Sequence, residues 1–454
     1  MEITREIHMQ QKTVHRLILF PLPLQGHITP MLQLASILYT KGFSITIIHT
    51  QFNPPNPSNY PCFAFHSIPD GLLESEANTS DVIRLLTLMN VNCITPFRDC
   101  LAKLLADVSK DPVACLITDA MWHFTQSVAE ILKIPRIVLR TSSVCSFLAF
   151  FALPHLLEKN LSIQEEPVQE LPPLKVKDLP MITTRNSEDL YQLLSLAVKE
   201  TRASSGFIWN SFEDLEPLAL TTCTQKLTIP TFPIGPFHKY FPASSSSLLT
   251  QDQSSISWLN TQAPKSVIYV SFGSIAALNE AQFLEIAWGL ANSNQPFLWV
   301  VRPGLVRGSE WLEPLPNGFL ENLNGRGHIV KWAPQEKVLA HHATGGFWTH
   351  NGWNSTLESI CEGVPMICQP FFGDQMVNAR YVSHVWKVGV HLENKIERME
   401  IARAIRRLMV ETDGKEKEMR ERIEHLKEKV DDCLSQGGSS YQSLENLTSY
   451  LLSF

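Results

Sequence analysis

Short apolar runs alternate with amphipathic stretches through the first half of the chain. Residues 16–20 and 43–50 are apolar runs, and residues 31–42 between them carry apolar positions at helical spacing up to Gly42. Such runs are typical of buried strands, and a glycine after the last periodic position is typical of a helix end. Further apolar runs lie at 113–118, 136–140 and 206–209. The alternation predicts an α/β fold, with a parallel sheet covered by helices on both faces.

The second half of the chain repeats this alternation without repeating any motif of the first. Its predicted strands lie at 266–274, 296–301, 327–332, 345–350 and 364–369. Its predicted helices lie at 279–293, 397–411 and 415–435. A chain of 454 residues exceeds what one hydrophobic core usually supports. We therefore predict two α/β domains.

Composition indicates where the first domain ends. Between residues 235 and 262 the chain carries Pro236, Pro242 and a serine run at 244–247, which is typical of a linker. The predicted domains are 1–240, with a linker to about 255, and 256–436.

Two further segments have a predicted form. Residues 437–454 are predicted to form a final helix with Tyr441, Leu444, Leu447 and Leu451 on one side. Residues 158–190 are rich in Pro, Glu and Leu without a clear period, so we expect loops and short helices near a substrate mouth.

Charge and cysteine content narrow the possible functions. The net charge of −7 and the pI near 6.1 argue against nucleic acid as a partner, because phosphate binding needs a basic face. Nine cysteines without a Cys-x-x-Cys pair indicate reduced thiols rather than disulfides or a zinc site. The first residues are charged, and no apolar run approaches the roughly 20 residues of a membrane span. We expect a soluble, cytoplasmic monomer that does not bind membranes.

Residues 332–375 carry the densest set of candidate binding residues. A predicted strand ends at His350, a turn follows through Asn351 and Gly352, and a helix opens at 354–356. The free N–H groups and the positive dipole end of such a helix attract an anion, and the glycine lets the backbone come close. His350 and Ser355 would add side-chain donors. This arrangement suits a diphosphate.

Other residues of the same stretch suit the rest of a nucleotide sugar. Glu358 lies one turn into the helix, within reach of sugar hydroxyls, and Trp332 offers a flat apolar face. Asp374 and Gln375 form an acid and amide pair after a strand-like run. Together with the anion site, these groups predict a nucleotide-sugar pocket.

The stretch 332–375 resembles, position by position and at the same length, the C-terminal box of the plant UDP-dependent glycosyltransferases. The resemblance implies the GT-B fold, in which two Rossmann-like domains face across a cleft and the C-terminal helix returns to the first domain. It also implies UDP-glucose as donor, since Gln375 is similar to the residue of glucose users. The donor-binding residues implied are Ser274, Trp332, Ala333, Gln335, His350, Trp353, Asn354, Ser355, Glu358, Asp374 and Gln375.

The resemblance divides this donor set among the parts of UDP-glucose. Trp332 would stack on uracil, Gln335 would lie near the base and ribose, and Glu358 would accept from the ribose hydroxyls. The residues implied for the diphosphate are His350, Asn354 and Ser355. The residues implied for the sugar are Trp353, Asp374 and Gln375.

Two residues in the first half are candidates for the catalytic base and its partner. His27 and Asp119 both fall just past the ends of predicted strands, where parallel sheets place their ligands. Imidazole titrates near neutral pH, and a carboxylate beside it would orient it and support its charge. Both segments resemble the catalytic dyad regions of the family. Taken alone, either residue also fits helix capping.

A metal is not indicated, because the chain contains no Asp-x-Asp pair. The departing diphosphate would instead meet the helix at 354, His350, Ser355 and the glycine turn 271–274. Attack from the face opposite UDP would invert the anomeric centre and give a β-glucoside.

The acceptor is predicted from further resemblance. Stretches 19–31, 136–150 and 437–441 resemble one plant subgroup, which includes steviol-glycoside glucosyltransferases and glucosyltransferases of small immune-signal acids. Those acids are N-hydroxypipecolic acid, salicylic acid and branched 2-hydroxy acids such as isoleucic acid. A pocket that binds such an acid needs a cation or hydroxyl groups to hold the carboxylate. The acceptor-binding candidates are Arg140, Thr141, Ser142 and His155, with apolar residues of 145–155 beside them. Arg140 equally fits a surface ion pair or an ion pair between domains.

Other functions remain open at this point. The same donor site would serve a glucosyltransferase acting on a flavonoid, terpenoid or cytokinin. A non-catalytic sugar-nucleotide sensor would have no chemical need for His27 and Asp119. A dinucleotide oxidoreductase is disfavoured, because no Gly-x-Gly-x-x-Gly opens a helix after a strand.

Overall fold

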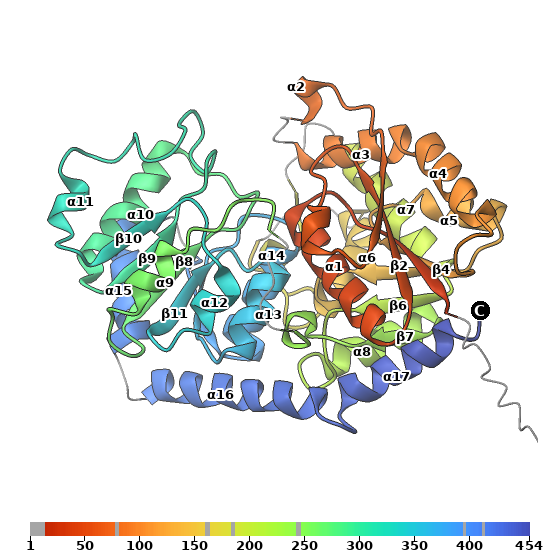
Figure 1. Ribbon diagram of the computed structural model, residues 1–454. Helices are drawn as coiled ribbons and strands as arrows, with labels where there is room; N and C mark the ends of the chain where they lie inside the picture. Colours follow the sequence, from red (N-terminus) through yellow and green to blue (C-terminus); the bar gives the residue numbers. More distant parts are fainter. Residues whose placement is uncertain are drawn as a thin grey trace, which may run out of the picture.

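Two α/β domains stand side by side, each built around one parallel sheet (Figure 1). The computed structural model describes residues 14–77, 81–158, 164–182, 187–241, 247–393, 396–410 and 414–454. Within them, the first sheet has the strand order β3-β2-β1-β4-β5-β6-β7 and the second the order β10-β9-β8-β11-β12-β13. In each sheet the strands that directly follow the first strand are added on one side of it, and the later strands are added on its other side. This order is the doubly wound arrangement. The predicted α/β class is confirmed.

The strands match the predicted apolar runs and add short edge strands. The first sheet comprises β1 (Arg16–Phe20), β2 (Ser44–Thr50), β3 (Ala64–Ile68), β4 (Val113–Asp119), β5 (Arg136–Arg140), β6 (Gly206–Trp209) and β7 (Thr231–Pro233). The second comprises β8 (Val267–Ser271), β9 (Phe297–Val300), β10 (Gly327–Val330), β11 (Thr344–Thr349), β12 (Met366–Cys368) and β13 (Gly389–His391). The strands β3, β7 and β13 were not predicted.

Helices surround both sheets. Those of the first half are α1 (Gln25–Thr40), α2 (Glu74–Ala77), α3 (Val82–Asn92), α4 (Ile94–Ala106), α5 (Thr125–Ile131), α6 (Val144–Glu158), α7 (Ser187–Arg202) and α8 (Pro217–Leu227). Those of the second half are α9 (Ser254–Leu259), α10 (Glu280–Ser293), α11 (Phe319–Asn322), α12 (Gln335–Leu339), α13 (Trp353–Cys361), α14 (Asp374–Arg380), α15 (Arg398–Val410), α16 (Gly414–Leu434) and α17 (Ser439–Leu451). Single turns are η1 (Pro57–Asn59), η2 (Val176–Asp178) and η3 (Phe237–Lys239), and η4 (Tyr381–Val385) is a π-helical turn.

Each sheet separates two apolar layers, because successive strand residues point to opposite faces. In β1, Ile18 and Phe20 pack into one core cluster, whereas Leu17 and Leu19 pack into the cluster on the other face. In β8, Tyr269 and its neighbours divide in the same way. A strand buried on both faces must be apolar throughout, which explains the continuous apolar runs of the sequence.

The C-terminal tail returns to the first domain, as predicted. Helix α16 runs along the base of the second domain, and α17 continues beneath the first, beside β7 (Figure 1). Leu444, Leu447 and Leu451 pack in the same core cluster as β1 residues. The Ser440 hydroxyl donates to Gly235 O at 2.6 Å and the Tyr450 hydroxyl to Ser205 O at 2.7 Å.

Some predictions fall outside the described ranges. They concern the N-terminal segment 1–13, residues 159–163 and 183–186 of the excursion at 158–190, and residues 244–246 of the serine run. The predicted domain boundaries stay predictions. No helix in the described part of the chain has the length and apolarity needed to cross a bilayer.

Candidate active site

A cavity of about 520 Å³ lies between the two domains, at the carboxyl ends of strands from both sheets. Every residue predicted to bind the donor lines it: Ser274, Trp332, Ala333, Gln335, His350, Trp353, Asn354, Ser355, Glu358, Asp374 and Gln375. His27, Arg140, Thr141 and Ser142 line it as well. The parallel strands explain this convergence, because their carboxyl ends all meet at the cleft.

His27 and Asp119 come together although they are far apart in the chain. His27 lies in the first turn of α1, and Asp119 ends the neighbouring strand β4. The His27 Nδ1 atom lies 2.7 Å from Asp119 Oδ2. Asp119 is 1% exposed, and its other oxygen accepts from Met121 N at 2.9 Å. A hydrogen bond on Nδ1 leaves the Nε2 atom of a neutral imidazole available as a base.

Thr141, directly after β5, reaches the same ring nitrogen of His27 as Asp119 does. Its hydroxyl oxygen is 3.0 Å from His27 Nδ1. The imidazole is therefore held by two polar groups from strands on the same sheet. Groups that restrict the ring in this way keep it in one orientation, which favours proton transfer from a bound hydroxyl.

The predicted anion site has an uncapped helix at its centre. Gly352 precedes α13, and no side chain caps the N–H groups of the first turn. Such groups are free to donate to a diphosphate. Asn351 has a φ of 60°, which turns the chain sharply between strand and helix. The sequence prediction of a strand, a turn and a helix start is confirmed here.

His350 is enclosed by two glycines. A Cβ atom added at Gly273 or at Gly352 would lie 2.5 Å from His350 Nε2, so no larger residue fits at either position without movement. Burial lowers the pKa of His350 to about 4, so the imidazole is neutral at pH 7. A neutral imidazole could serve a diphosphate only as a hydrogen-bond partner and not as a counter-charge.

Gln335 connects the groups predicted to hold the uridine. Its Nε2 atom donates to Glu358 Oε2 at 2.7 Å and to Ser355 Oγ at 2.9 Å, and its Oε1 atom accepts from the Tyr269 hydroxyl at 3.2 Å. Burial, together with the charge of the neighbouring Glu336, raises the pKa of Glu358 to about 8, although the hydrogen bond from Gln335 acts in the opposite direction. Ribose hydroxyls that donate to this carboxylate would favour its charged form.

Two of the three predicted sugar-binding residues, Asp374 and Gln375, open helix α14. Gln375 Oε1 accepts from Phe371 N at 2.9 Å and from Phe372 N at 3.3 Å, which leaves the amide nitrogen to face the cavity. Burial raises the pKa of Asp374, while a hydrogen bond from Asn378 lowers it. The third predicted sugar residue, Trp353, is 2% exposed, and its indole donates to Asn210 O of the first domain at 2.7 Å.

The candidate acceptor residues separate into two groups. Arg140 is 8% exposed and donates from Nε to Ser142 Oγ at 3.1 Å. Its guanidinium lies 5.6 Å from the Phe147 ring centre and 5.5 Å from that of Phe150. Among the described residues it has no carboxylate within 4.0 Å. His155, by contrast, is exposed on α6 and does not line the cavity.

Within the described residues Arg140 forms no ion pair across the domain interface, so the structure does not show the interdomain alternative. Burial lowers its pKa, while the charges of Asp119 and Asp374 raise it. Both carboxylates act on it from beyond ion-pair distance. The domains are joined near the site by other contacts, including Asn354 Nδ2 to Gly26 O at 3.0 Å.

The structure also shows site residues that the sequence did not reveal. Apolar side chains from α3, from α7 and from loops, including those before α1 and α14 and after β4, line this part of the cavity: Leu24, Val82, Ile83, Leu86, Met121, Ile182, Leu194 and Phe372. Each looks like an ordinary core position in sequence. Of the predicted apolar stretch 145–155, only Phe150 lines the cavity. In the described part of the chain, no group of three or more His, Cys, Asp or Glu residues could hold a metal ion.

The fold and the cleft define a glycosyltransferase that binds a nucleotide sugar between two Rossmann-like domains. A family model described as UDP-glucoronosyl and UDP-glucosyl transferase matches residues 246–430. UDP-glycosyltransferase 76B1 from Arabidopsis thaliana is 56% identical over 96% of this chain and 98% of its own length. UDP-glycosyltransferase 76G1 from Stevia rebaudiana is 51% identical over 96% of this chain and 97% of its own.

Solved structures agree with these relatives. The Phytolacca americana enzyme UGT2, complexed with UDP-2fluoro-glucose and pterostilbene, superposes with a TM-score of 0.82 at 30% identity, covering 96% of this chain and 100% of its own. A UDP-glucose: anthocyanidin 3-O-glucosyltransferase in complex with UDP gives a TM-score of 0.85 at 25% identity, covering 97% and 99%. The chain belongs to the plant family 1 UDP-glycosyltransferases, and the predicted GT-B fold is confirmed. Its co-substrate is a UDP-sugar.

Proposed function

We propose that this enzyme transfers glucose from UDP-glucose to the hydroxyl of a small hydroxylated carboxylic acid, of the N-hydroxypipecolic acid, salicylic acid or isoleucic acid type. The observation that carries this acceptor class is Arg140. It places a buried guanidinium on the acceptor side of the cleft with no carboxylate of the described chain within 4.0 Å. A buried cation without a partner is costly, and the carboxylate of a substrate would compensate it.

The dyad accounts for the chemistry. His27 Nε2 accepts the proton of the acceptor hydroxyl, and Asp119 stabilises the imidazolium that results. The acceptor oxygen forms a bond to C1 of glucose while the bond from C1 to the phosphate oxygen breaks. UDP leaves with the electron pair. Attack from the face opposite UDP inverts C1, so an α-linked donor gives a β-glucoside.

The second domain binds the donor and stabilises the leaving group. The N–H groups at the start of α13, with His350 and Ser355, would meet the charge that develops on the diphosphate. Glu358 would accept from the ribose, Trp332 would stack on uracil, and the α14 pair would hold the glucose hydroxyls. This assignment follows the positions of these residues around one cavity.

Glucosylation would change what such an acid does. A sugar on the hydroxyl makes the acid larger and more polar, so a receptor built for the free acid no longer fits it. We propose that the enzyme inactivates small immune-signal acids of plants in this way.

A second acceptor class fits a different observation. The acceptor side is lined largely by apolar side chains from α3, α6 and α7, which would suit a flavonoid, terpenoid or cytokinin. The structural relative complexed with pterostilbene and the one named for anthocyanidin support this alternative.

One panel of assays separates the two classes. The purified protein is incubated with UDP-glucose and, separately, with salicylic acid, N-hydroxypipecolic acid, isoleucic acid and a flavonol. The readouts are the mass gain of one hexose and the UDP released. We expect transfer to the acids and little to the flavonol. Transfer to the flavonol alone would keep the donor and dyad assignments and replace the acceptor, and no transfer at all would favour a sensor.

A further inference from the structure

Asn378 occupies a central place in helix α14 that the reaction scheme above does not use. Its side chain is 1% exposed. The Nδ2 atom donates to Asp374 Oδ2 at 3.1 Å and to Asn351 O at 2.9 Å. One amide therefore holds both a proposed sugar-binding carboxylate and the turn that opens the anion site.

The other end of the same amide reaches the first domain. Asn378 Oδ1 accepts from Ser143 Oγ at 2.8 Å and from Ser146 Oγ at 3.0 Å. These serines lie directly after Arg140, Thr141 and Ser142, at the start of α6. Asn378 thus uses two donor hydrogens and two acceptor lone pairs, which is the full capacity of an amide. Of the four partners, Asn351, Ser143 and Ser146 are buried, and Asp374 lines the cavity.

We propose that Asn378 is a positioning residue for glycosyl transfer. It fixes the sugar-binding carboxylate and the diphosphate turn relative to the strand end that holds the acceptor, and so aligns C1 of the sugar with the acceptor hydroxyl. The inference rests on the proposed function, because the contact between Asp374 and the sugar is part of it. Alignment matters to the rate, since a misplacement of about 1 Å costs about 100-fold.

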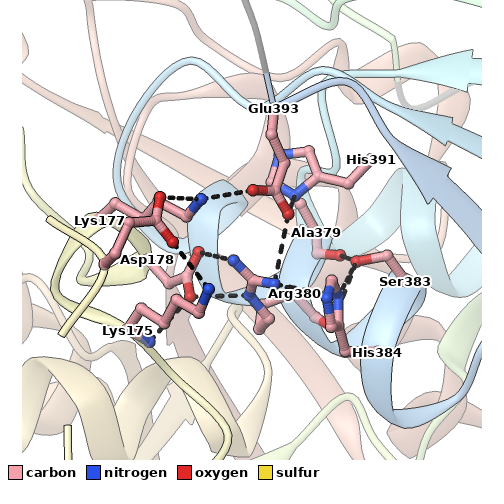
Figure 2. Close-up of polar contacts among 10 residues, drawn as sticks. Lys175, Lys177, Asp178, Ala379, Arg380, Ser383, His384, His391 and Glu393 are labelled. Atoms are coloured by element: carbon pink, nitrogen blue, oxygen red, sulfur yellow. Dashed lines mark hydrogen bonds and ion pairs between the residues drawn. The ribbon is translucent and has the colours of Figure 1, made fainter. Parts of the chain in front are cut away.

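A matched control lies at the far end of the same helix. Figure 2 shows Arg380 among Asp178, His384 and Glu393. Its Nε donates to Asp178 Oδ2 at 2.7 Å and its Nη2 to Asp178 Oδ1 at 3.0 Å, and Nη1 lies 3.4 Å from Glu393 Oε1. This buried pair also ties α14 to the first domain. In the described part of the chain, no hydrogen bond or ion pair joins Arg380 or Asp178 to Asp374 or Asn351.

The test compares Asn378→Ala with Asp178→Asn and the wild type. Each protein is assayed with UDP-glucose and salicylic acid, or the flavonol if that is the better substrate. Glucoside, total UDP and free glucose are all measured. Free glucose reports hydrolysis, in which a water oxygen bonds to C1 and UDP leaves. A melting temperature is taken for each protein.

We expect Asn378→Ala to lower kcat for transfer by about 10- to 100-fold with a smaller change in KM for UDP-glucose. The ratio of free glucose to glucoside should rise, because the donor still reacts with water when the acceptor is misaligned. Asp178→Asn should lower the melting temperature and leave that ratio at the wild-type value. A merely structural role for Asn378 would make the two variants alike.

The outcomes separate the inference from the proposal beneath it. If Asn378→Ala keeps the wild-type ratio of glucose to glucoside, or if Asp178→Asn raises it equally, the positioning role is wrong. Should Asn378→Ala fail to fold, the Ser143→Ala, Ser146→Ala double variant removes both cross-domain donors to Asn378, together with the local bond from Ser146 N to Ser143 Oγ. An unchanged ratio there overturns the inference. A wild-type protein that releases no UDP with any acceptor contradicts the proposed function instead.

Discussion

The donor and acceptor sides of the cleft differ in how the chain builds them. Most donor-side residues come from one continuous segment, 332–375, and most are polar. The acceptor side is assembled from the ends of β1, β4 and β5 and from helices α3, α6 and α7, and most of its side chains are apolar. Arg140 and the residues beside His27 are the polar exceptions there. The polar donor would therefore be bound mainly by residues of one segment, whose relative positions are fixed locally. The acceptor would be bound by side chains from elements that lie far apart in the chain.

This difference has a practical consequence. On the donor side, Gln335 links Tyr269, Ser355 and Glu358, so a change at one position leaves buried polar partners unsatisfied. On the acceptor side, an apolar wall tolerates substitution of one residue with loss of some contact area only. Acceptor preference is therefore able to change while donor binding stays constant.

Removing the base should have the largest effect, because both sides of the cleft depend on it. His27→Ala is expected to lower kcat by about 100- to 10,000-fold with any acceptor. The loss of kcat is measured from the UDP released and the glucoside formed. As the control, the affinity for UDP, measured by calorimetry, should remain at the wild-type value. Asp119→Asn should lower kcat as well, because it weakens support for the imidazolium. A His27→Ala enzyme that transfers at the original rate would disprove the base assignment.

A donor-side change should affect the donor alone. Glu358→Gln removes the carboxylate that would accept from ribose, and hydrogen bonds to a charged group contribute about 1.5–3 kcal/mol. We expect KM for UDP-glucose to rise about 10- to 100-fold while KM for the acceptor stays constant. The control is Glu362→Gln, one turn further along, whose carboxylate pairs with Lys239 Nζ at 2.9 Å outside the cavity. Equal increases in both KM values would mean that the two sides are not separable.

An acceptor-side change should distinguish between acceptors. Arg140→Met keeps much of the contact with Phe147 and Phe150 and removes the charge. KM for salicylic acid should rise about tenfold, corresponding to about 1.5 kcal/mol, whereas KM for a neutral flavonol should not change. Arg202→Met is the control, because Arg202 lies 4.7 Å from the Phe151 ring on the surface of the same domain. A flavonol KM that rises in parallel would argue against a carboxylate partner for Arg140.

The smallest effect concerns stability against pH. Burial and the nearby charge of Glu336 raise the pKa of Glu358 from 4.5 to about 8, so between these values the native state holds a proton that the unfolded state has lost. The free energy of unfolding therefore falls as pH rises through this window. Without UDP-glucose, the melting temperature of wild type should drop between pH 5 and 8 by about 2–4 °C more than that of Glu358→Gln. Arg140→Met should follow the wild-type slope. Identical slopes for wild type and Glu358→Gln would contradict the raised pKa.

Much of the fold was predictable because its strands are buried on both faces. The runs at 16–20, 113–118 and 136–140 became β1, β4 and β5, and the tail became α17. The strands β3, β7 and β13 escaped prediction because they lie at sheet edges, where short segments with partly exposed side chains do not form continuous apolar runs.

The sequence by itself predicted the fold class, the donor-side residues that the structure brings to one cavity, and the two residues, His27 and Asp119, that it pairs. A strand, a turn and a helix start are local structures, so residues close together in the chain already have fixed relative positions. Only the tertiary structure decided that His27 lies 2.7 Å from Asp119, that Arg140 faces the cleft while His155 faces solvent, and that Asn378 joins both domains. These three positions depend on how the helices are rotated and how the domains pack. Both are decided by many weak contacts over the whole chain, so no single segment of the sequence carries a pattern for them.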